Sequence, residues 1–365
     1  MPTRPKRCGA TTAARATASR ADAALRKWAG KADVTVVPGL NNTVGRSYAA
    51  AAAAAKAADI AIVVVGLTPC GGHAPSGPWY DLECNEGESH DRNEHTPDLG
   101  SLELPGSQQA LVEAVAKANP NYVLVLINGG ALGIDRAKAN SPAIVEAFYP
   151  GESGGPAIID VLDGSYNPTA KLPYTIYPAA FNLTRPITDM SLRGGQGITH
   201  MHYTGTPLWE FGSGPSYSKF SVELLNSDDE LSAGEFGAEA SNRAYSVRVT
   251  NTGGVAGGLN VIGFVTCAGC NAESFPLQRL FGFVGTFLSC TGGLPCGTAV
   301  WYGRVVRLAH PSAKQLSVAD EDGRQWLHPA EYTVHIGGTP SEELTVTAAL
   351  SVTGTAAVAQ SAALP

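Results

Sequence analysis

The stretch "DIAIVVVG" (residues 59–66) decides the fold of the first half of this chain. It is a short apolar, β-branched run without polar alternation, which is typical of a strand buried on both faces of a parallel sheet. "YVLVLING" (122–129) repeats the pattern, and "PGSQQALVEAVAKANP" (105–120) between them has the apolar spacing of a helix. This alternation predicts an α/β sandwich, a mostly parallel sheet with flanking helices.

Four further segments extend this domain. "VTVVPG" (34–39) and "AIVEAFYPG" (143–151) are predicted strands, whereas residues 47–57 and "GGPAIIDVLDG" (154–164) are predicted helices. We assign residues 31–180 to the α/β sandwich domain.

Residues 1–30 form a basic N-terminal segment that we expect to be disordered. The first 20 residues contain five Arg or Lys and no acid. They lack the apolar run of a secretory signal peptide, although their Arg, Ser and Ala content is similar to that of a transit peptide. A disordered or mis-assigned start is the simpler interpretation.

The second half changes to short alternating segments. Four of them read as strands: "YSVRVTNTGG" (245–254), "LNVIGFVTC" (259–267), "YGRVVRLAH" (302–310) and "EYTVHIGG" (331–338). Turn residues separate them, which predicts an all-β sandwich of immunoglobulin-like size over 221–350. Residues 181–220, rich in Gly, Pro, Thr and aromatic side chains, are predicted to be a packed linker, and 351–365 a tail.

Composition argues against two classes of partner. The formal net charge is −7, whereas nucleic-acid binding needs a basic surface. The longest apolar run is interrupted by Lys56 and Asp59, so it does not read as a membrane span. We therefore expect neither nucleic acid nor a membrane as a partner.

Four of the seven cysteines follow one another closely. They have the spacing C-x2-C, then 19 residues, then C-x5-C, and are Cys267, Cys270, Cys290 and Cys296. The second pair is too widely spaced for a zinc knuckle, so two disulfides in an oxidising compartment are the favoured interpretation. Asn41 and Asn182 lie in N-x-[ST] sequons, which also fit secretion.

A long polar loop follows the first buried strand. It covers residues 67–103 and contains "EGESHDR" (86–92), with two carboxylates, an imidazole and an Asp-Arg pair in seven positions. Ligands of parallel α/β sheets bind beyond the carboxyl ends of strands, where this loop begins. Loops of this length inside a compact domain are usually functional. The loop is therefore the expected site.

The segment "YPGESGGPAIIDVLDGSYNPTAKLPYT" (149–175) and the junction "GSGPSY" (212–217) carry a family resemblance. With the strands above, they resemble the C-terminal half of glycoside hydrolase family 3, closest to plant-type β-D-xylosidases, over roughly residues 30–340. The resemblance implies a six-stranded α/β sandwich followed by a fibronectin type III-like domain. It also implies a secreted, exo-acting, retaining β-xylosidase-like enzyme without cofactor, acting on xylan-derived or related β-linked oligosaccharides.

The resemblance implies a role for Glu88. Retaining glycosidases use one carboxyl group as nucleophile and another as general acid/base. The family's acid/base lies in a pattern similar to Glu-x-x-Asp-Arg, which Glu88 begins in this chain. Glu86 is the alternative, or a neighbour whose charge raises the pKa of Glu88. Asp91 and Arg92 are expected to support the loop.

Other loop residues allow more than one interpretation. Trp79 and Tyr80 are candidates for stacking on a sugar ring, or for packing on the domain. A disulfide between Cys70 and Cys84 would restrict the loop, but the two thiols are equally well unrelated. His90 has no neighbours at a fixed metal-ligand spacing, so we expect no metal site.

The nucleophile is expected to be outside this chain. Members of the resembled family carry an aspartate nucleophile on an N-terminal (β/α)8 barrel, and no Ser-Asp-Trp segment occurs here. We therefore expect a fragment that supplies the acid/base, needs a family-type barrel and is inactive when isolated. The alternative is a non-catalytic carbohydrate-binding or interaction module. A nucleotide-binding protein is disfavoured because no strand is followed by G-x-G-x-x-G or a P-loop.

Overall fold

The chain folds into two compact units, which the computed structural model describes over most of their length. The described residues are 7–12, 33–38, 48–67, 102–104, 107–186, 188–226, 230–232, 243–270, 275–288, 304–319, 322–339 and 343–357. The first unit comprises Met1–Ser165, Ile176–Thr188 and Thr206–Leu208, and the second Tyr166–Thr175, Asp189–Gly205 and Trp209–Pro365. We refer to them as the α/β unit and the β unit. The segment 181–220 is divided between both.

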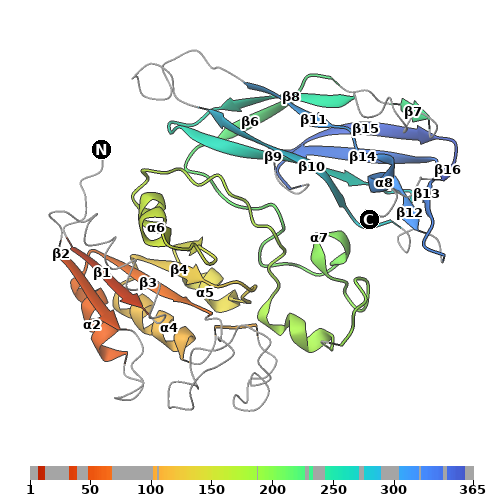
Figure 1. The fold of residues 1–365 in the computed structure, drawn as a ribbon. Helices are drawn as coiled ribbons and strands as arrows, with labels where there is room; N and C mark the ends of the chain where they lie inside the picture. Colours follow the sequence, from red (N-terminus) through yellow and green to blue (C-terminus); the bar gives the residue numbers. More distant parts are fainter. Residues whose placement is uncertain are drawn as a thin grey trace. The chain divides into compact units, whose positions relative to one another are not determined.

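The α/β unit is built on one parallel sheet (Figure 1). Its strand order is β2-β1-β3-β4-β5. The strands are β1 (Arg7–Thr12), β2 (Asp33–Pro38), β3 (Ile60–Gly66), β4 (Tyr122–Ile127) and β5 (Ala143–Glu146). Every neighbouring pair is parallel, which confirms the predicted parallel sheet.

The observed sheet differs from the sequence predictions in two respects. β1 lies within residues 1–30, which we expected to be disordered, and it pairs with both β2 and β3. Its sequence "RCGATT" has no apolar run to signal a strand, so pairing with its two neighbours sets its conformation. The resemblance implied six strands, whereas the described residues form five.

Helices cover both faces of the sheet. They are α2 (Ala49–Ala57), α4 (Gln108–Ala118), α5 (Asp135–Asn140) and α6 (Gly154–Leu162), followed by the 3-10 helix η2 (Ala179–Thr184). α2 and α4 lie side by side on one face and α6 on the other (Figure 1). Ile158 and Ile159 of α6 pack in one cluster with four apolar side chains of β3 and β4. Continuous burial on both faces explains why these strands lack polar alternation.

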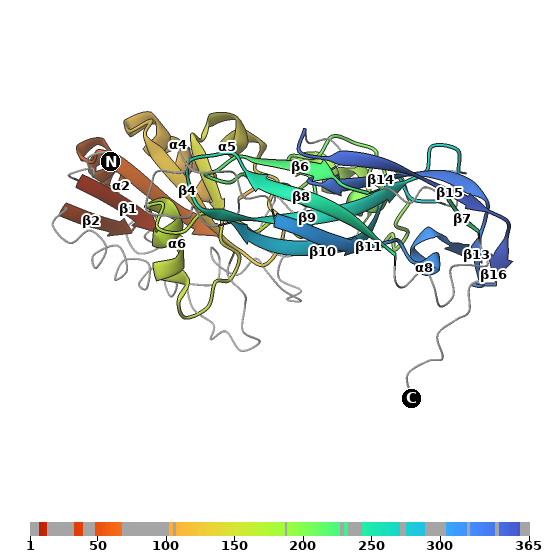
Figure 2. The same ribbon diagram turned by 90° about the horizontal axis from the view of Figure 1, so that it is seen from above.

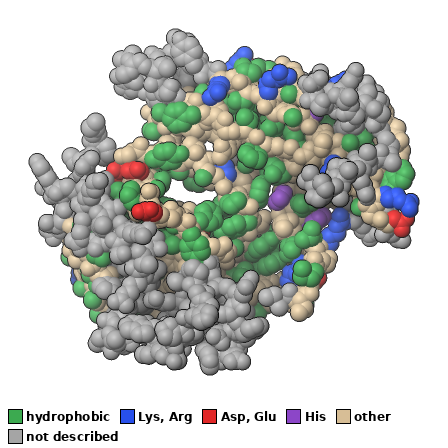
Figure 3. Space-filling model, viewed as in Figure 1, with side chains coloured by type: hydrophobic (Ala, Val, Ile, Leu, Met, Phe, Trp, Pro, Cys, Tyr) green, Lys and Arg blue, Asp and Glu red, His purple; other side chains and the backbone are tan. Residues whose placement is uncertain are grey.

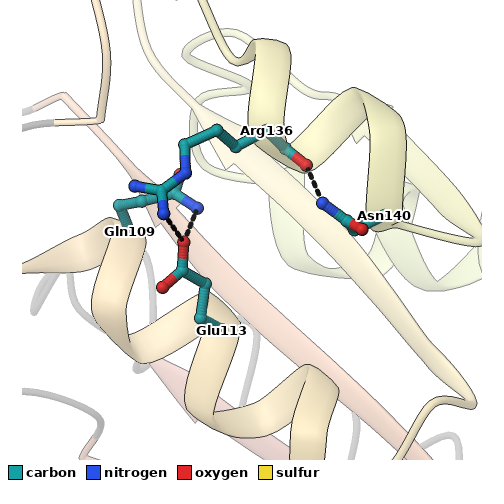
Figure 4. Close-up of polar contacts among 4 residues, drawn as sticks. All are labelled: Gln109, Glu113, Arg136 and Asn140. Carbon is teal, nitrogen blue, oxygen red and sulfur yellow. Dashed lines mark hydrogen bonds and ion pairs between the residues drawn. The ribbon is translucent and has the colours of Figure 1, made fainter.

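Polar side chains tie the helices together. Asn119, directly after α4, donates through Nδ2 to the carbonyl oxygens of Ala55 and Ala58 at the end of α2. On the surface, Arg136 of α5 forms an ion pair of 2.9 Å with Glu113 of α4 (Figure 4). Gln109, one helical turn before Glu113, donates to the same carboxylate.

The β unit contains sheets whose strand pairs are antiparallel, except for one short edge strand that pairs in parallel. The strands are β6 (Phe220–Leu224), β7 (Glu230–Ser232), β8 (Ala244–Asn251), β9 (Gly257–Thr266), β10 (Arg279–Leu288), β11 (Arg304–Ala309), β12 (Val318–Ala319), β13 (Gln325–Leu327), β14 (Ala330–Gly337), β15 (Val346–Thr353) and β16 (Ala356–Ala357). Two short helices accompany them, α7 (Thr199–His202) and α8 (Ala313–Leu316). The sheet orders are β10-β9-β14-β15-β7, β11-β8-β6 and β12-β13-β16. Figure 2 shows the long strands β9, β10, β14 and β15 running together.

One apolar core joins the five-stranded sheet of the β unit to the sheet β11-β8-β6. It contains inward-facing residues of β8 and β11 together with those of β9, β14 and β15. This agrees with the predicted all-β half, but β15 continues to Thr353 and β16 to Ala357, beyond the expected boundary at 350. On the face shown in Figure 3, the described Lys and Arg side chains are scattered rather than gathered into one patch.

Two further observations concern the sequence predictions. Cys267 and Cys270 form a disulfide at the end of β9, whereas Cys290 and Cys296 lie outside the described residues. Within the part of the chain that the structure describes, no helix is both long and apolar enough to cross a membrane.

Candidate functional site

The predicted site residues lie outside the described part of the chain. They share the loop between β3 and α4, and are Trp79, Tyr80, Glu86, Glu88, Asp91 and Arg92. Their roles remain predictions. The residues from which this loop departs are described, and they form the carboxyl edge of the parallel sheet.

The root of the loop is firmly held at Gly66 and Leu67. Gly66 has φ +148°, and a Cβ added there would overlap the carbonyl oxygen of Ile127. The buried Gln108 side chain accepts from the Gly66 amide at 2.7 Å and donates to the Gly66 carbonyl at 2.8 Å. The Leu67 amide donates to Ile127 at 2.9 Å, and the Tyr149 hydroxyl donates to the Leu67 carbonyl at 3.3 Å. The loop therefore starts from a fixed point at the carboxyl end of β3.

An amide and a carboxyl group meet at the neighbouring strand ends. Asn128 directly follows β4, and Glu146 is the last residue of β5. Asn128 Nδ2 donates to the Gly130 carbonyl at 2.7 Å and lies 3.5 Å from Glu146 Oε2. The other carboxyl oxygen of Glu146 accepts from the Phe148 amide at 3.2 Å. The parallel register, which brings Leu126 opposite Glu146, places these groups together.

Burial changes the acidity of Glu146. It raises the pKa of this carboxyl to about 7, while the hydrogen bonds from Phe148 and Asn128 oppose the shift. Among the described residues, no charged side chain contributes to it. Near neutral pH, Glu146 thus exchanges readily between an acid that donates a hydrogen bond and a carboxylate that only accepts.

Two features of this edge are costly for the fold. Asn128 is fully buried, and among the described residues its Oδ1 has no hydrogen-bond partner. A buried acceptor without a donor costs about 1–3 kcal/mol. Phe148 has φ +51°, a left-handed conformation that is unusual for a bulky residue and costs a similar amount. Such costs collect at functional sites.

No sequence pattern predicted a site role for Asn128, Glu146, Phe148 or Gln108. One signal was available, since Glu146 is the only acid in the apolar run "AIVEAF". The proximity of Asn128 and Glu146, 18 positions apart, follows only from the strand register. Across the described ranges, no group of three or more His, Cys, Asp or Glu side chains is arranged to hold a metal ion.

Comparison with known proteins gives relatives of one family. The chain is 30% identical to beta-xylosidase/alpha-L-arabinofuranosidase 1 of Medicago sativa subsp. varia, over 66% of this chain and 33% of that protein. It is 38% identical to the probable beta-D-xylosidase 6 of Arabidopsis thaliana, over 52% of this chain and 22% of that protein. The chain thus spans a third or less of these relatives.

Solved structures show the same fold. A GH3 exo-beta-xylosidase (XlnD), in complex with a xylobiose aziridine activity-based probe, matches with a TM-score of 0.76 at 22% identity, covering 99% of this chain and 46% of that one. A beta-D-glucoside glucohydrolase from Trichoderma reesei matches with a TM-score of 0.68 at 22% identity, covering 97% and 52%.

The family model for the glycosyl hydrolase family 3 C-terminal domain matches residues 9–217, more than half of the chain. This range contains the whole described parallel sheet except the first two residues of β1, the loop with "EGESHDR", and the carboxyl edge with Asn128 and Glu146. The chain belongs to the family of glycosyl hydrolase family 3 C-terminal domains.

Proposed function

We propose that this chain is the acid/base-bearing part of an exo-acting, retaining, β-xylosidase-like glycoside hydrolase. The observation that carries the proposal is the family match, because it spans the sheet and the loop with the Glu-x-x-Asp-Arg pattern. That loop leaves the carboxyl end of β3, the edge where α/β sheets bind ligands. The names of the relatives support a β-xyloside as substrate.

In this proposal Glu88 is the general acid/base. It protonates the leaving oxygen of the glycosidic bond and then accepts a proton from the attacking water. Glu86 keeps the pKa of Glu88 high, since a nearby negative charge disfavours ionisation. Asp91 and Arg92 support the loop, and Trp79 and Tyr80 stack on the sugar. The rigid root at Gly66 and Leu67 limits where the loop can carry Glu88.

The nucleophile is proposed to be an aspartate on a family-type barrel that is not part of the matched region. The β unit is proposed to be fibronectin type III-like, which its shared core between two mainly antiparallel sheets supports. Secretion is also part of the proposal, and the Cys267–Cys270 disulfide supports it because disulfides persist in oxidising compartments.

The test of Glu88 uses this chain fused behind the barrel of the Medicago relative. We expect turnover of aryl β-xylosides, with Glu88→Gln slowing poor leaving groups about 10²–10⁴-fold and activated leaving groups far less. Added azide should restore activity on the activated substrate. Glu86→Gln is the matched control and should lower the rate less. Equal losses for both kinds of leaving group would rule out an acid role for Glu88.

The test of the nucleophile uses the purified 365-residue chain alone. We expect no release of chromophore from an aryl β-xyloside above the buffer rate. Robust turnover that Glu88→Gln abolishes would place both carboxyl groups in this chain. If the barrel fusion is folded, binds xylobiose and never turns over, the alternative of a non-catalytic carbohydrate-binding module is favoured.

A further inference from the structure

We infer that the Asn128 amide and the Glu146 carboxyl form a binding subsite for a hydroxyl group of a neutral saccharide. The subsite lies at the carboxyl ends of β4 and β5, two neighbouring strands of the parallel sheet. The inference rests on the proposed function for its ligand class, and it adds two residues that no part of the proposed acid/base chemistry uses.

The amide oxygen of Asn128 is an unsatisfied acceptor. It is buried and has no donor in the part of the chain that the structure describes, although the same amide is oriented by its 2.7 Å bond to the Gly130 carbonyl. The turn after β4 needs only the Nδ2 group of this amide. The buried Oδ1 contributes nothing to the turn, and leaving it without a hydrogen bond costs about 1–3 kcal/mol of stability. A ligand that brings a hydrogen-bond donor removes this cost.

The contact between the two side chains is weak. Asn128 Nδ2 and Glu146 Oε2 are 3.5 Å apart, at the outer limit for a hydrogen bond. A hydroxyl group both donates and accepts. It would donate to Asn128 Oδ1 and accept from protonated Glu146, replacing one long contact with two good ones.

The backbone at Phe148 also bears on the subsite. The Phe148 amide donates to Glu146 Oε1 at 3.2 Å, and Phe148 itself has a left-handed φ of +51°. The hydrogen bond orients the carboxyl group that lies beside Asn128. Strain in a non-glycine residue beside a buried acid is expected at a ligand site and not at an ordinary strand end.

The chemistry of these groups excludes other ligand classes. An anion would place its oxygens against Asn128 Oδ1 and the Glu146 carboxyl, with no described cationic group contributing there. A hard cation needs six or more oxygen ligands, and these two residues supply only a few. Among the described residues near these strand ends, Tyr149 is also titratable, and its hydroxyl donates to the Leu67 carbonyl. A neutral hydroxyl is the group that matches one free acceptor beside one protonated acid.

The test is calorimetric titration of the full chain with xylobiose at pH 5.5 and pH 8.5. We expect binding to weaken about ten-fold at pH 8.5, because ionised Glu146 loses its donor and the ligand further desolvates the charge. Glu146→Gln keeps a donor, so its binding should not change with pH. Glu152→Gln, which removes a nearby exposed carboxyl, is the matched control and should behave as the wild type.

A second measurement needs no variant. At pH 7.5, xylobiose binding to the wild-type chain should take up protons, seen as a binding enthalpy that depends on the ionisation enthalpy of the buffer. Absence of binding, of proton uptake, or of any difference between Glu146→Gln and wild type would overturn the inference. Failure of the proposed function is distinguishable, since it appears as an unchanged turnover in the Glu88→Gln fusion while xylobiose binding persists.

Discussion

The two units bury titratable groups in different settings. In the β unit, three buried or partly buried titratable groups have hydrogen-bond partners in the fold. The Tyr332 hydroxyl donates to the Leu316 carbonyl, His335 pairs with Thr266, and Arg279 Nη1 donates to the carbonyl oxygens that end α8. In the α/β unit, Glu146 lies beside the Asn128 amide, whose oxygen has no hydrogen-bond partner within the described ranges.

The physical cause of the pKa shifts is the same in both units. Burial raises the pKa of Tyr332 and lowers the pKa of His335, as it raises that of Glu146. A shifted pKa alone therefore does not mark a site. The difference lies in what surrounds these particular groups: Tyr332 and His335 each have a side-chain hydrogen bond to another element, whereas Glu146 lies beside an amide oxygen that has no partner among the described residues, two positions before the left-handed Phe148.

Replacing Phe264 should have the largest effect. Its side chain is fully buried in β9, and its ring contacts His200 and Phe211 with centroids 6.0 Å apart in each case. We expect Phe264→Ala to lower the free energy of unfolding by about 3–5 kcal/mol, because it leaves a cavity. Denaturant unfolding measures the loss. Hydrogen exchange should place it in β9 and β14, with little change in β3 and β4.

The control for Phe264 is a phenylalanine on the next strand. Phe283 of β10 is 74% exposed, so Phe283→Ala should change stability by less than about 0.5 kcal/mol. A comparable loss for both variants would show that the burial of Phe264 against His200 and Phe211 does not stabilise the β unit.

The pH dependence of stability should separate Glu146 from the partnered groups. Its pKa rises from 4.5 in the unfolded chain to about 7 in the folded protein, so the folded state binds more protons between these values. Stability therefore falls as pH rises from 4.5 through 7, by about 3 kcal/mol at most. Glu146→Gln should remove this fall.

The measurement is the free energy of unfolding of wild type and Glu146→Gln at pH values from 4 to 8.5. Glu152→Gln, which removes an exposed carboxyl six positions downstream, is the matched control. Parallel curves for wild type and Glu146→Gln would mean that Glu146 is solvated as in the unfolded chain, and the comparison between the units would lose its basis.

Much of the fold could be predicted from the sequence, because burial leaves a regular trace. β3 and β4 were predicted from continuous apolar runs, and α4 from its apolar face. β10 was missed, since its exposed Phe283 and Phe287 give an apolar signal on the solvent side and two glycines interrupt it. β1 was missed because a short strand between two neighbours needs no apolar run of its own.

The site was predictable only in part. Glu88, Asp91 and Arg92 lie within five positions of one another, so a family sequence pattern was enough to predict them as site residues. Asn128 and Glu146 meet through strand register, and the desolvation of Glu146 depends on the packing around β5. Neither the strand register nor the degree of desolvation can be derived from the order of the residues. A single acid in an apolar strand is nevertheless a signal to examine.

A smaller loss is expected at the root of the loop. Gly66→Ala should cost about 1–3 kcal/mol from its backbone conformation alone, and the added Cβ also overlaps the Ile127 carbonyl. Gly151→Ala is the matched control, because Gly151 also has a positive φ, of +69°, but open space around it. The difference in unfolding free energy between the variants measures the close approach of β3 and β4. Equal losses would show that the strand ends separate easily.

The smallest effect is expected on the surface of the α/β unit, where Glu113 accepts from Gln109 and pairs with Arg136 (Figure 4). Both charged side chains are about half exposed or more, so water and salt screen the pair. A double-mutant cycle of Glu113→Gln and Arg136→Met should give a coupling free energy of about 0.2–1 kcal/mol that decreases with added salt. A coupling above 2 kcal/mol, unchanged by salt, would mean that α4 and α5 exclude water around it. Polar contacts shielded from water would then occur on the surface of this unit as well. The carboxyl edge with Asn128 and Glu146 would no longer differ from the rest of the unit in this respect.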